Sequence, residues 1–156
     1  MPAGRNPGGF IVQSPVGAAR APGFTLPGLD GRQRSLEEFS GQVVLLHFWA
    51  SWCAPCIEEF PAIERLSALF KGRDLTVLAV AEDSEKRARS FVDRQGFSSA
   101  VLIDRWGKVG RAYGLLVIPY SVVIGRDGMI KGVISGPRDY SGLAAAEYFE
   151  GVLSER

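Results

Sequence analysis

Residues 43–60, VVLLHFWASWCAPCIEEF, contain three structural signals in succession. The short apolar run over 43–49 is rich in β-branched and aromatic residues, which predicts a buried strand. Pro55 suits the first turn of a helix, because its missing N–H needs no partner there. The pattern therefore predicts a strand-to-helix turn with Cys53 at the helix N-terminus and Cys56 one turn further on.

This placement has a chemical consequence for Cys53. The N-terminus of a helix carries unpaired N–H groups and the positive end of the helix dipole, so it stabilises negative charge. A thiolate forms more readily there, and the thiolate is the nucleophilic form of cysteine. Cys56 would be close enough to attack a mixed disulfide on Cys53, so the pair could cycle between dithiol and disulfide.

The chain contains only these two cysteines, which argues against a framework of structural disulfides. Two incidental buried thiols remain an alternative, although the turn context and the flanking Trp52 and Pro55 favour a redox pair. A zinc site needs four ligands. With one histidine and no second cysteine pair, it would require two chains sharing the metal. We therefore expect no metal and no cofactor.

Composition excludes several classes of function. The chain has 156 residues, of which 46% are hydrophobic and 22% charged, which is typical of one globular domain. Its net charge of +1, without long runs of one sign, predicts no nucleic-acid partner. No apolar stretch reaches the length of a transmembrane helix.

The first twenty residues differ in composition from the rest. Residues 1–20 are rich in Gly and Pro and are predicted to form a flexible arm, with residues 21–156 forming the domain. A short strand is expected at 10–12. Arg5 is not followed by the apolar core of a secretory signal. Either the protein stays in the cytosol or a targeting segment was removed.

The remaining signals give the order of elements. A hairpin is expected around the turn at 28–31, then a short helix with the capping-box pattern of Ser35 and Glu38. Leu69 and Leu143 are expected on the buried sides of their helices. The order β-α-β-α, then hairpin and helix, predicts a mixed sheet with helices on both faces. The other expected elements are helix 53–70, strand 75–81, helix 84–94, a strand or extended segment at 100–103, a brief helix at 108–113, a hairpin of 121–124 and 129–135, and helix 141–153.

This combination resembles the thioredoxin fold and, more narrowly, the TlpA/ResA-like thiol–disulfide oxidoreductases, which are related to the AhpC/TSA proteins. The resemblance implies a three-layer α/β/α sandwich with a mixed central sheet and an extra N-terminal β-hairpin. The matching residues span about 22–153. They are Pro22-Gly23-Phe24-Thr25-Leu26-Pro27, Leu29-Asp30-Gly31, Ser35-Leu36, Phe48–Cys56, Glu59-Phe60-Pro61 and Ile118-Pro119.

The resemblance also implies roles for individual residues. Cys53 would be the attacking thiolate and Cys56 the resolving thiol of a redox-active disulfide. Pro119 aligns with a cis-proline that faces the two sulfurs, and the Ile118 backbone would pair with an extended client segment. Without the resemblance, a trans proline at the start of an edge strand would be the simpler interpretation of Pro119. Pro55 would support the turn between the cysteines.

Two polar residues near the cysteines have competing interpretations. Glu59 aligns with an acidic residue of the ResA-like proteins and shares a helix face with Cys56, so it could exchange a proton with that thiol. It could equally be a solvated surface carboxylate like Glu58. His47 stands where thioredoxins carry a buried aspartate. We favour a hydrogen-bonded core histidine over a proton acceptor beneath Cys56.

Two aromatic residues also bear on the site. Trp52 would be an exposed aromatic that shields the disulfide, or it could simply pack within its loop. Tyr120 replaces the threonine that commonly follows the cis-proline, and we expect it to reshape the client groove.

The function implied by the resemblance is reduction of disulfides in client proteins, such as apocytochrome c, by a monomer that a membrane dithiol donor recharges. An extracytoplasmic or periplasmic location follows from the family alone. A thiol peroxidase is a weaker alternative, because Leu46 and Ala50 stand where the peroxiredoxin motif has Pro and Thr. A copper-binding module is weaker still, because no histidine follows Cys56.

Overall fold

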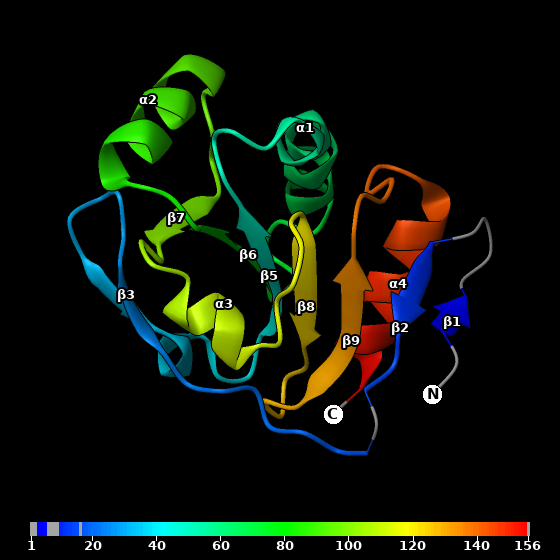
Figure 1. Cartoon of the computed structure of the whole chain (residues 1–156). Coiled ribbons are helices and arrows are strands. Elements are labelled where there is room, and N and C mark those ends of the chain that lie inside the picture. The colour runs from blue at the N-terminus through cyan, green and yellow to red at the C-terminus, as the bar shows by residue number, and fades with distance from the viewer. Residues whose placement is uncertain (1–2, 6–9, 16, 156) are drawn as a thin grey trace.

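The strand predicted at 43–49 lies inside a seven-stranded sheet in the computed structural model, which describes residues 3–5, 10–15 and 17–155 (Figure 1). All seven residues of this strand, β5, are buried, as its apolar sequence predicts. The strands of the sheet, in spatial order, are β1 (Ala3–Arg5), β2 (Ile11–Gln13), β9 (Ile130–Ser135), β8 (Tyr120–Ile124), β5 (Val43–Trp49), β6 (Leu75–Ala81) and β7 (Ala100–Ile103).

The sheet has a parallel half and an antiparallel half. Strand β5 runs parallel to β6, which runs parallel to β7. On its other side β5 runs antiparallel to β8, and β8 and β9 form the predicted hairpin. The parallel strands are joined by α1 (Ala54–Leu69) and α2 (Glu85–Gln95), as parallel connections require. The predicted mixed sheet is therefore confirmed.

Helices cover both faces of this sheet. Leu45 of β5 packs with residues of α1 and of α4 (Leu143–Ser154), while Trp49 packs near α2. Leu46, whose side chain points to the opposite face, packs under α3 (Lys108–Ala112) and the N-terminal hairpin. Because alternate residues of a strand point to opposite faces, a single strand supplies both cores. The result is the predicted three-layer α/β/α sandwich.

The extra hairpin protects an edge of the sheet. Its strands, β3 (Thr25–Pro27) and β4 (Gln33–Ser35), form a separate two-stranded sheet and lead into the 3₁₀ helix η1 (Leu36–Phe39). The Leu29 N–H donates to the Val101 carbonyl of β7 at 3.0 Å, so the hairpin covers the outer edge of β7.

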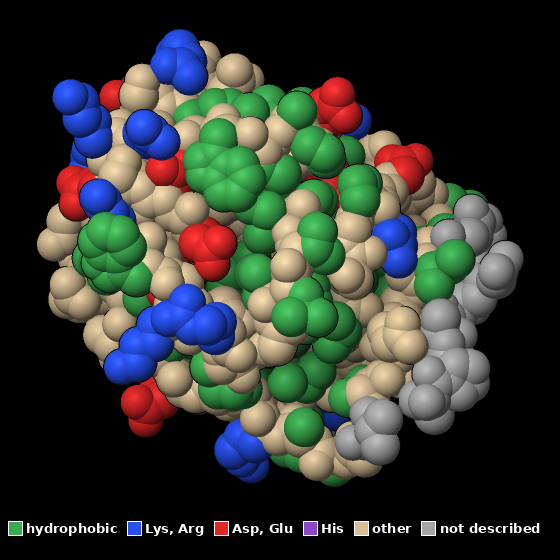
Figure 2. Space-filling view, viewed as in Figure 1, with side chains coloured by type: hydrophobic (Ala, Val, Ile, Leu, Met, Phe, Trp, Pro, Cys, Tyr) green, Lys and Arg blue, Asp and Glu red, His purple; other side chains and the backbone are tan. Residues whose placement is uncertain are grey.

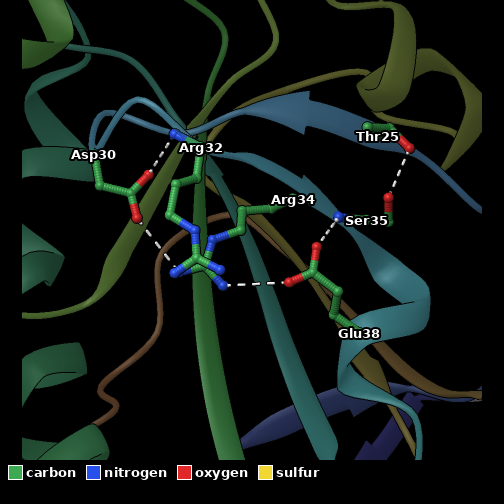
Figure 3. Close-up of polar contacts among 6 residues, drawn as sticks. All are labelled: Thr25, Asp30, Arg32, Arg34, Ser35 and Glu38. Atoms are coloured by element: carbon green, nitrogen blue, oxygen red, sulfur yellow. Dashed lines mark hydrogen bonds and ion pairs between the residues drawn. The ribbon is translucent and has the colours of Figure 1, made fainter.

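Polar contacts hold the hairpin in shape (Figure 3). The Arg34 guanidinium lies 3.4 Å from both Asp30 and Glu38. The Ser35 N–H donates to Glu38 at 2.8 Å, as the capping-box pattern predicts. The hydroxyls of Thr25 and Ser35 are 2.8 Å apart across the two strands.

Part of the predicted N-terminal arm belongs to the sheet. Strand β2 pairs with β9 through Gln13 and Val133, and the side chains of Phe10 and Val12 are buried in the core beside α4. The short strand expected at 10–12 is thus present, one residue further along. Residues 1–2, 6–9 and 16 of the arm lie outside the described part of the chain, and the domain boundary at residue 20 stays a prediction.

Two helix positions differ from expectation. Leu69 and Leu143 were expected to face the core, but both side chains are mostly exposed. Each is next to a buried residue, Phe70 and Ala144 respectively, and the helical rotation that turns this neighbour to the core turns Leu69 and Leu143 to solvent. Helix α1 itself continues through Pro61 to Leu69.

Candidate active site

Cys53 and Cys56 are joined by a disulfide at the N-terminus of α1, with their Cα atoms 5.3 Å apart. Cys53 is the N-cap residue, and its sulfur accepts a hydrogen bond from the Cys56 backbone N–H at 3.3 Å. Pro55 lies in the first turn, where no intrahelical donor is lost. The sulfur of Cys53 therefore sits where helix N–H groups favour negative charge.

The two cysteines differ in accessibility. Cys53 is 6% exposed, whereas Cys56, in the first turn of α1, is completely buried. An external thiol or disulfide can therefore approach Cys53 but not Cys56.

A buried aspartate fixes the turn that leads to Cys53. Asp83 accepts hydrogen bonds from the Ser51 N–H at 2.9 Å and the Ser51 hydroxyl at 2.5 Å, and its other oxygen accepts from the Ser84 N–H at 2.8 Å. It thereby joins the end of β5 to the connection between β6 and α2. Sequence analysis missed Asp83, because an aspartate before a helix is common and nothing local links it to Ser51.

The Ile118–Pro119 peptide bond is cis. Pro119 is buried, and Ile118 packs against the apolar cluster that contains both cysteines. The hydrogen-bonded ladders of β8 begin only at Tyr120, so Ile118 lies just outside them.

Apolar side chains are exposed near these elements. Trp52 is 62% exposed beside Cys53, and Leu116 and Val117 are exposed just before Ile118. Figure 2 shows hydrophobic side chains running through the middle of one face of the molecule, with charged side chains on both sides of this band.

Glu59 differs from its neighbour Glu58 in its surroundings. Glu58 is exposed, whereas Glu59 is buried and accepts a hydrogen bond from the Arg138 N–H at 2.5 Å. Burial raises the pKa of Glu59 to about 7, although the Arg138 N–H and charge act in the opposite direction. The interpretation of Glu59 as a solvated surface residue is wrong, and its carboxyl group titrates near neutral pH.

His47 lies on β5 with no exposed surface. Its Nδ1 is 2.7 Å from the hydroxyl of Ser121 on β8, and that hydroxyl also accepts a hydrogen bond from the Tyr140 hydroxyl at 3.1 Å. Its Nε2 lies 3.7 Å from Glu59 Oε1. Burial lowers the pKa of His47 to about 3, so the ring is neutral at physiological pH. The preferred interpretation of a hydrogen-bonded core histidine agrees with this geometry.

Tyr120 occupies a different place from the one expected. Its ring is buried in the core under α3, and its hydroxyl donates to the Tyr113 carbonyl at 2.9 Å. Because β8 directs this side chain to the face opposite α1, Tyr120 does not shape a groove beside the cysteines.

Sequence analysis also missed Ser121, Arg138 and Tyr140. All three reach the His47–Glu59 region through β8 or the connection after β9. No local motif could have identified them, because their positions follow from how β8 pairs with β5 and how the connection after β9 packs against α1 and β5. The described residues contain no group of three or more His, Cys, Asp or Glu side chains suited to a metal ion. Within the same residues, no helix has the length and apolarity needed to span a membrane.

Known proteins resemble this chain over most of its length. A model of the AhpC/TSA family matches residues 18–133. The thioredoxin-like protein YneN of Bacillus subtilis (strain 168) is 37% identical over 121 residues, which cover 75% of this chain and 70% of that protein. The thiol-disulfide oxidoreductase ResA of Geobacillus thermodenitrificans (strain NG80-2) is 34% identical over 117 residues, covering 74% of this chain and 67% of that protein.

A solved structure extends the similarity to three dimensions. A crystal structure described as a thiol:disulfide interchange protein DsbE from Chlorobium tepidum superposes with a TM-score of 0.83 and 32% sequence identity. The match covers 90% of this chain and all of that one.

Proposed function

This chain belongs to the AhpC/TSA family and, within it, to the ResA-like thiol–disulfide oxidoreductases, and from that premise we propose that its Cys53–Cys56 pair reduces disulfides in client proteins. The observation that carries the proposal is the disulfide at the N-terminus of α1, in which only Cys53 reaches the surface.

The reaction begins with the reduced pair. The Cys53 thiolate attacks one sulfur of the client disulfide, forming a Cys53–client bond, while the other client sulfur leaves as a thiolate and takes up a proton. Cys56 then loses its proton and attacks the Cys53 sulfur. This second attack forms the Cys53–Cys56 disulfide and releases the remaining client thiolate. The client gains two electrons, and the cysteine pair loses them.

The helix N-terminus favours the first attack. The Cys56 N–H that donates to the Cys53 sulfur would stabilise a thiolate at the same atom. Cys56 lacks this position and is enclosed, so its thiol needs a base before it can attack.

Glu59 is our candidate for that base. It lies three residues after Cys56, which puts both residues on one face of α1. A carboxyl group with a pKa of about 7 is suited to both accepting and returning a proton at neutral pH.

The surroundings of the disulfide suit an extended protein segment. The Ile118 backbone lies outside the β8 ladders and would pair with client backbone, while Pro119 fixes its orientation. The exposed Trp52 and Val117 would cover apolar client side chains.

Recycling requires a second partner. After each turnover a dithiol donor would reduce the Cys53–Cys56 disulfide. By analogy with the family, we propose an extracytoplasmic location with clients such as apocytochrome c. The cysteines and the polar groups around them come from one copy of the chain, and we propose that it acts as a monomer.

The experiment compares three proteins with insulin as a model client disulfide. The wild type should accelerate insulin reduction by dithiothreitol. Reduced Cys56→Ser should accumulate a mixed disulfide through Cys53, detectable by mass spectrometry, whereas Cys53→Ser should form none. A Cys53→Ser protein that still trapped insulin would refute the assignment, and rapid hydrogen peroxide consumption by the wild type would favour a peroxidase instead.

A further inference from the structure

Two buried polar atoms near the cysteines face each other without hydrogen-bond partners. Within the described residues, neither His47 Nε2 nor Glu59 Oε1 has a hydrogen bond, and they lie 3.7 Å apart. A buried polar atom without a hydrogen-bond partner costs free energy. Because these two atoms face each other, a hydrogen bond between them would satisfy both. A hydrogen bond would require the flexible Glu59 side chain to move by roughly 0.5 Å or more.

Their neighbours determine which atom carries the proton. The Ser121 hydroxyl has one proton and contacts both the Tyr140 hydroxyl and His47 Nδ1. If Tyr140 donates to Ser121, then Ser121 donates to Nδ1, and the neutral imidazole carries its proton on Nε2. The reverse order would leave the buried Tyr140 proton without an acceptor among the described residues. If Tyr140 and Nδ1–H both donated to Ser121, the Ser121 proton would lack an acceptor in the same part of the chain. The chain Tyr140–Ser121–His47 therefore directs an Nε2–H group at Glu59.

We propose that His47 is a positioning residue, which donates Nε2–H to Glu59 Oε1 and so holds the carboxylate ready to accept the Cys56 proton. The proposal rests on the proposed function, because it assigns His47 to the step in which Cys56 becomes a nucleophile. Glu59 would then have one donor on each oxygen, with Arg138 N–H on Oε2 and His47 on Oε1.

Besides His47, titratable groups from α1 and from the connection after β9 lie near Glu59. On its own helix it shares a face with Cys56. The connection after β9 contributes the positive charge of Arg138, which lowers the pKa of Glu59, and Tyr140, whose own pKa is raised by burial and by Glu59. The charge of Tyr148, on α4, raises the pKa of Tyr140 further. The Arg138 Nε donates to the Ile11 carbonyl at 3.0 Å, so this part of the guanidinium is engaged elsewhere.

The predicted effect follows from which form the bond stabilises. A hydrogen bond to the carboxylate favours the ionised form of Glu59. Its loss should raise the pH midpoint of the Cys56-dependent step by roughly one unit and slow that step about five- to tenfold at pH 7.

The first measurement reads the tautomer directly. His47 is the only histidine in the chain, so ¹⁵N-histidine labelling gives a single pair of ring nitrogen signals. In the oxidised wild type above pH 8 we expect the Nε2–H tautomer. In Tyr140→Phe, the Ser121 hydroxyl loses the donor that orients it and can accept a hydrogen bond from Nδ1–H. The fraction of the Nδ1–H tautomer should therefore increase. An Nδ1–H wild type would overturn the proposal.

The second measurement reads the chemistry. We would measure the rate at which saturating glutathione disulfide oxidises the reduced protein, as a function of pH. The midpoint of this pH profile should lie higher in His47→Phe and in Tyr140→Phe than in the wild type. Tyr148→Phe is the matched control, because the Tyr148 hydroxyl has no hydrogen-bond partner in the described part of the chain. If His47→Phe does not fold, Tyr140→Phe still tests the hydrogen-bonded series, because Tyr140 acts on His47 through the Ser121 hydroxyl.

The outcomes separate the two proposals. Unchanged midpoints in both variants, with an active wild type, would refute the role of His47 while leaving the oxidoreductase assignment intact. A wild type that exchanges no disulfide would refute the proposed function, even if the tautomer were as expected.

Discussion

At the residue scale, Glu58 and Glu59 show how one position on a helix changes the chemistry of a carboxyl group. Glu58 faces solvent, whereas Glu59 lies on the buried side of α1, and burial raises its pKa to about 7. A carboxyl whose pKa is higher in the folded than in the unfolded state stabilises the fold at low pH. That contribution is complete below about pH 4.5 and is lost as pH rises through about 7.

Replacing Glu59 tests this linkage. We compare the free energy of unfolding of oxidised Glu59→Gln with that of the oxidised wild type. From pH 4 to pH 8 the difference should shift in favour of the variant by on the order of 3 kcal/mol, because only the wild type must ionise a buried carboxyl group. Urea unfolding at the two pH values measures the difference. His47, whose depressed pKa removes stability below about pH 6.5, gives an opposite contribution in both proteins. Between pH 6.5 and pH 8 its ring is neutral in both, so the difference over that range comes from Glu59.

Glu58→Gln provides the control for the same chemical change at an exposed site. Its stability relative to the wild type should stay nearly constant over this pH range. Equal behaviour of the two variants would contradict a buried, shifted Glu59.

At the scale of elements, the turn between β5 and α1 depends on a neighbouring connection. Asp83 accepts two hydrogen bonds from Ser51 and one from Ser84, so the start of α2 holds the residues that precede Cys53. The position of the disulfide is thus set by two crossover connections together.

Removing the Asp83 carboxylate should loosen this turn. Asp83→Ala leaves the Ser51 N–H and hydroxyl without their acceptor, and we expect a loss of about 1–3 kcal/mol in the free energy of unfolding. Thermal unfolding of the oxidised protein measures it. Asp93→Ala, at an exposed position of α2, should change stability by less than about 0.5 kcal/mol. An Asp83→Ala protein as stable as this control would exclude an anchoring role.

At the scale of the whole molecule, the N-terminal segment completes the core beside α4. The Phe10 ring packs against Tyr140 at 5.4 Å between centroids and lies near Tyr148 and Phe149. It thus supports the side of the sheet on which the His47 network lies.

Truncating Phe10 distinguishes a packed strand from a flexible arm. Phe10→Ala should lower the free energy of unfolding by about 3–5 kcal/mol, because it leaves a cavity among aromatic side chains. Leu116→Ala, at a side chain that is 94% exposed, should be nearly neutral. A neutral Phe10→Ala, measured by the same urea titration, would support the arm predicted for residues 1–20.

Local sequence alone determined the strand-to-helix turn that carries the cysteines, the two hairpins and the mixed sheet. Each of these depends on periodicity, turn residues or capping within a few positions, so the signal is contained in the segment itself. The resemblance added the alignment of Pro119, which spacing could not supply.

Only the tertiary structure decided the surroundings of the disulfide. His47 meets Ser121 across 74 positions and Glu59 meets Arg138 across 79, and no pattern in either segment indicates its partner. The same holds for Asp83 and Ser51, for the burial of Phe10 and for the exposure of Leu69. Which side chains meet, and whether water reaches them, depends on how whole elements pack, and this packing sets the pKa of Glu59.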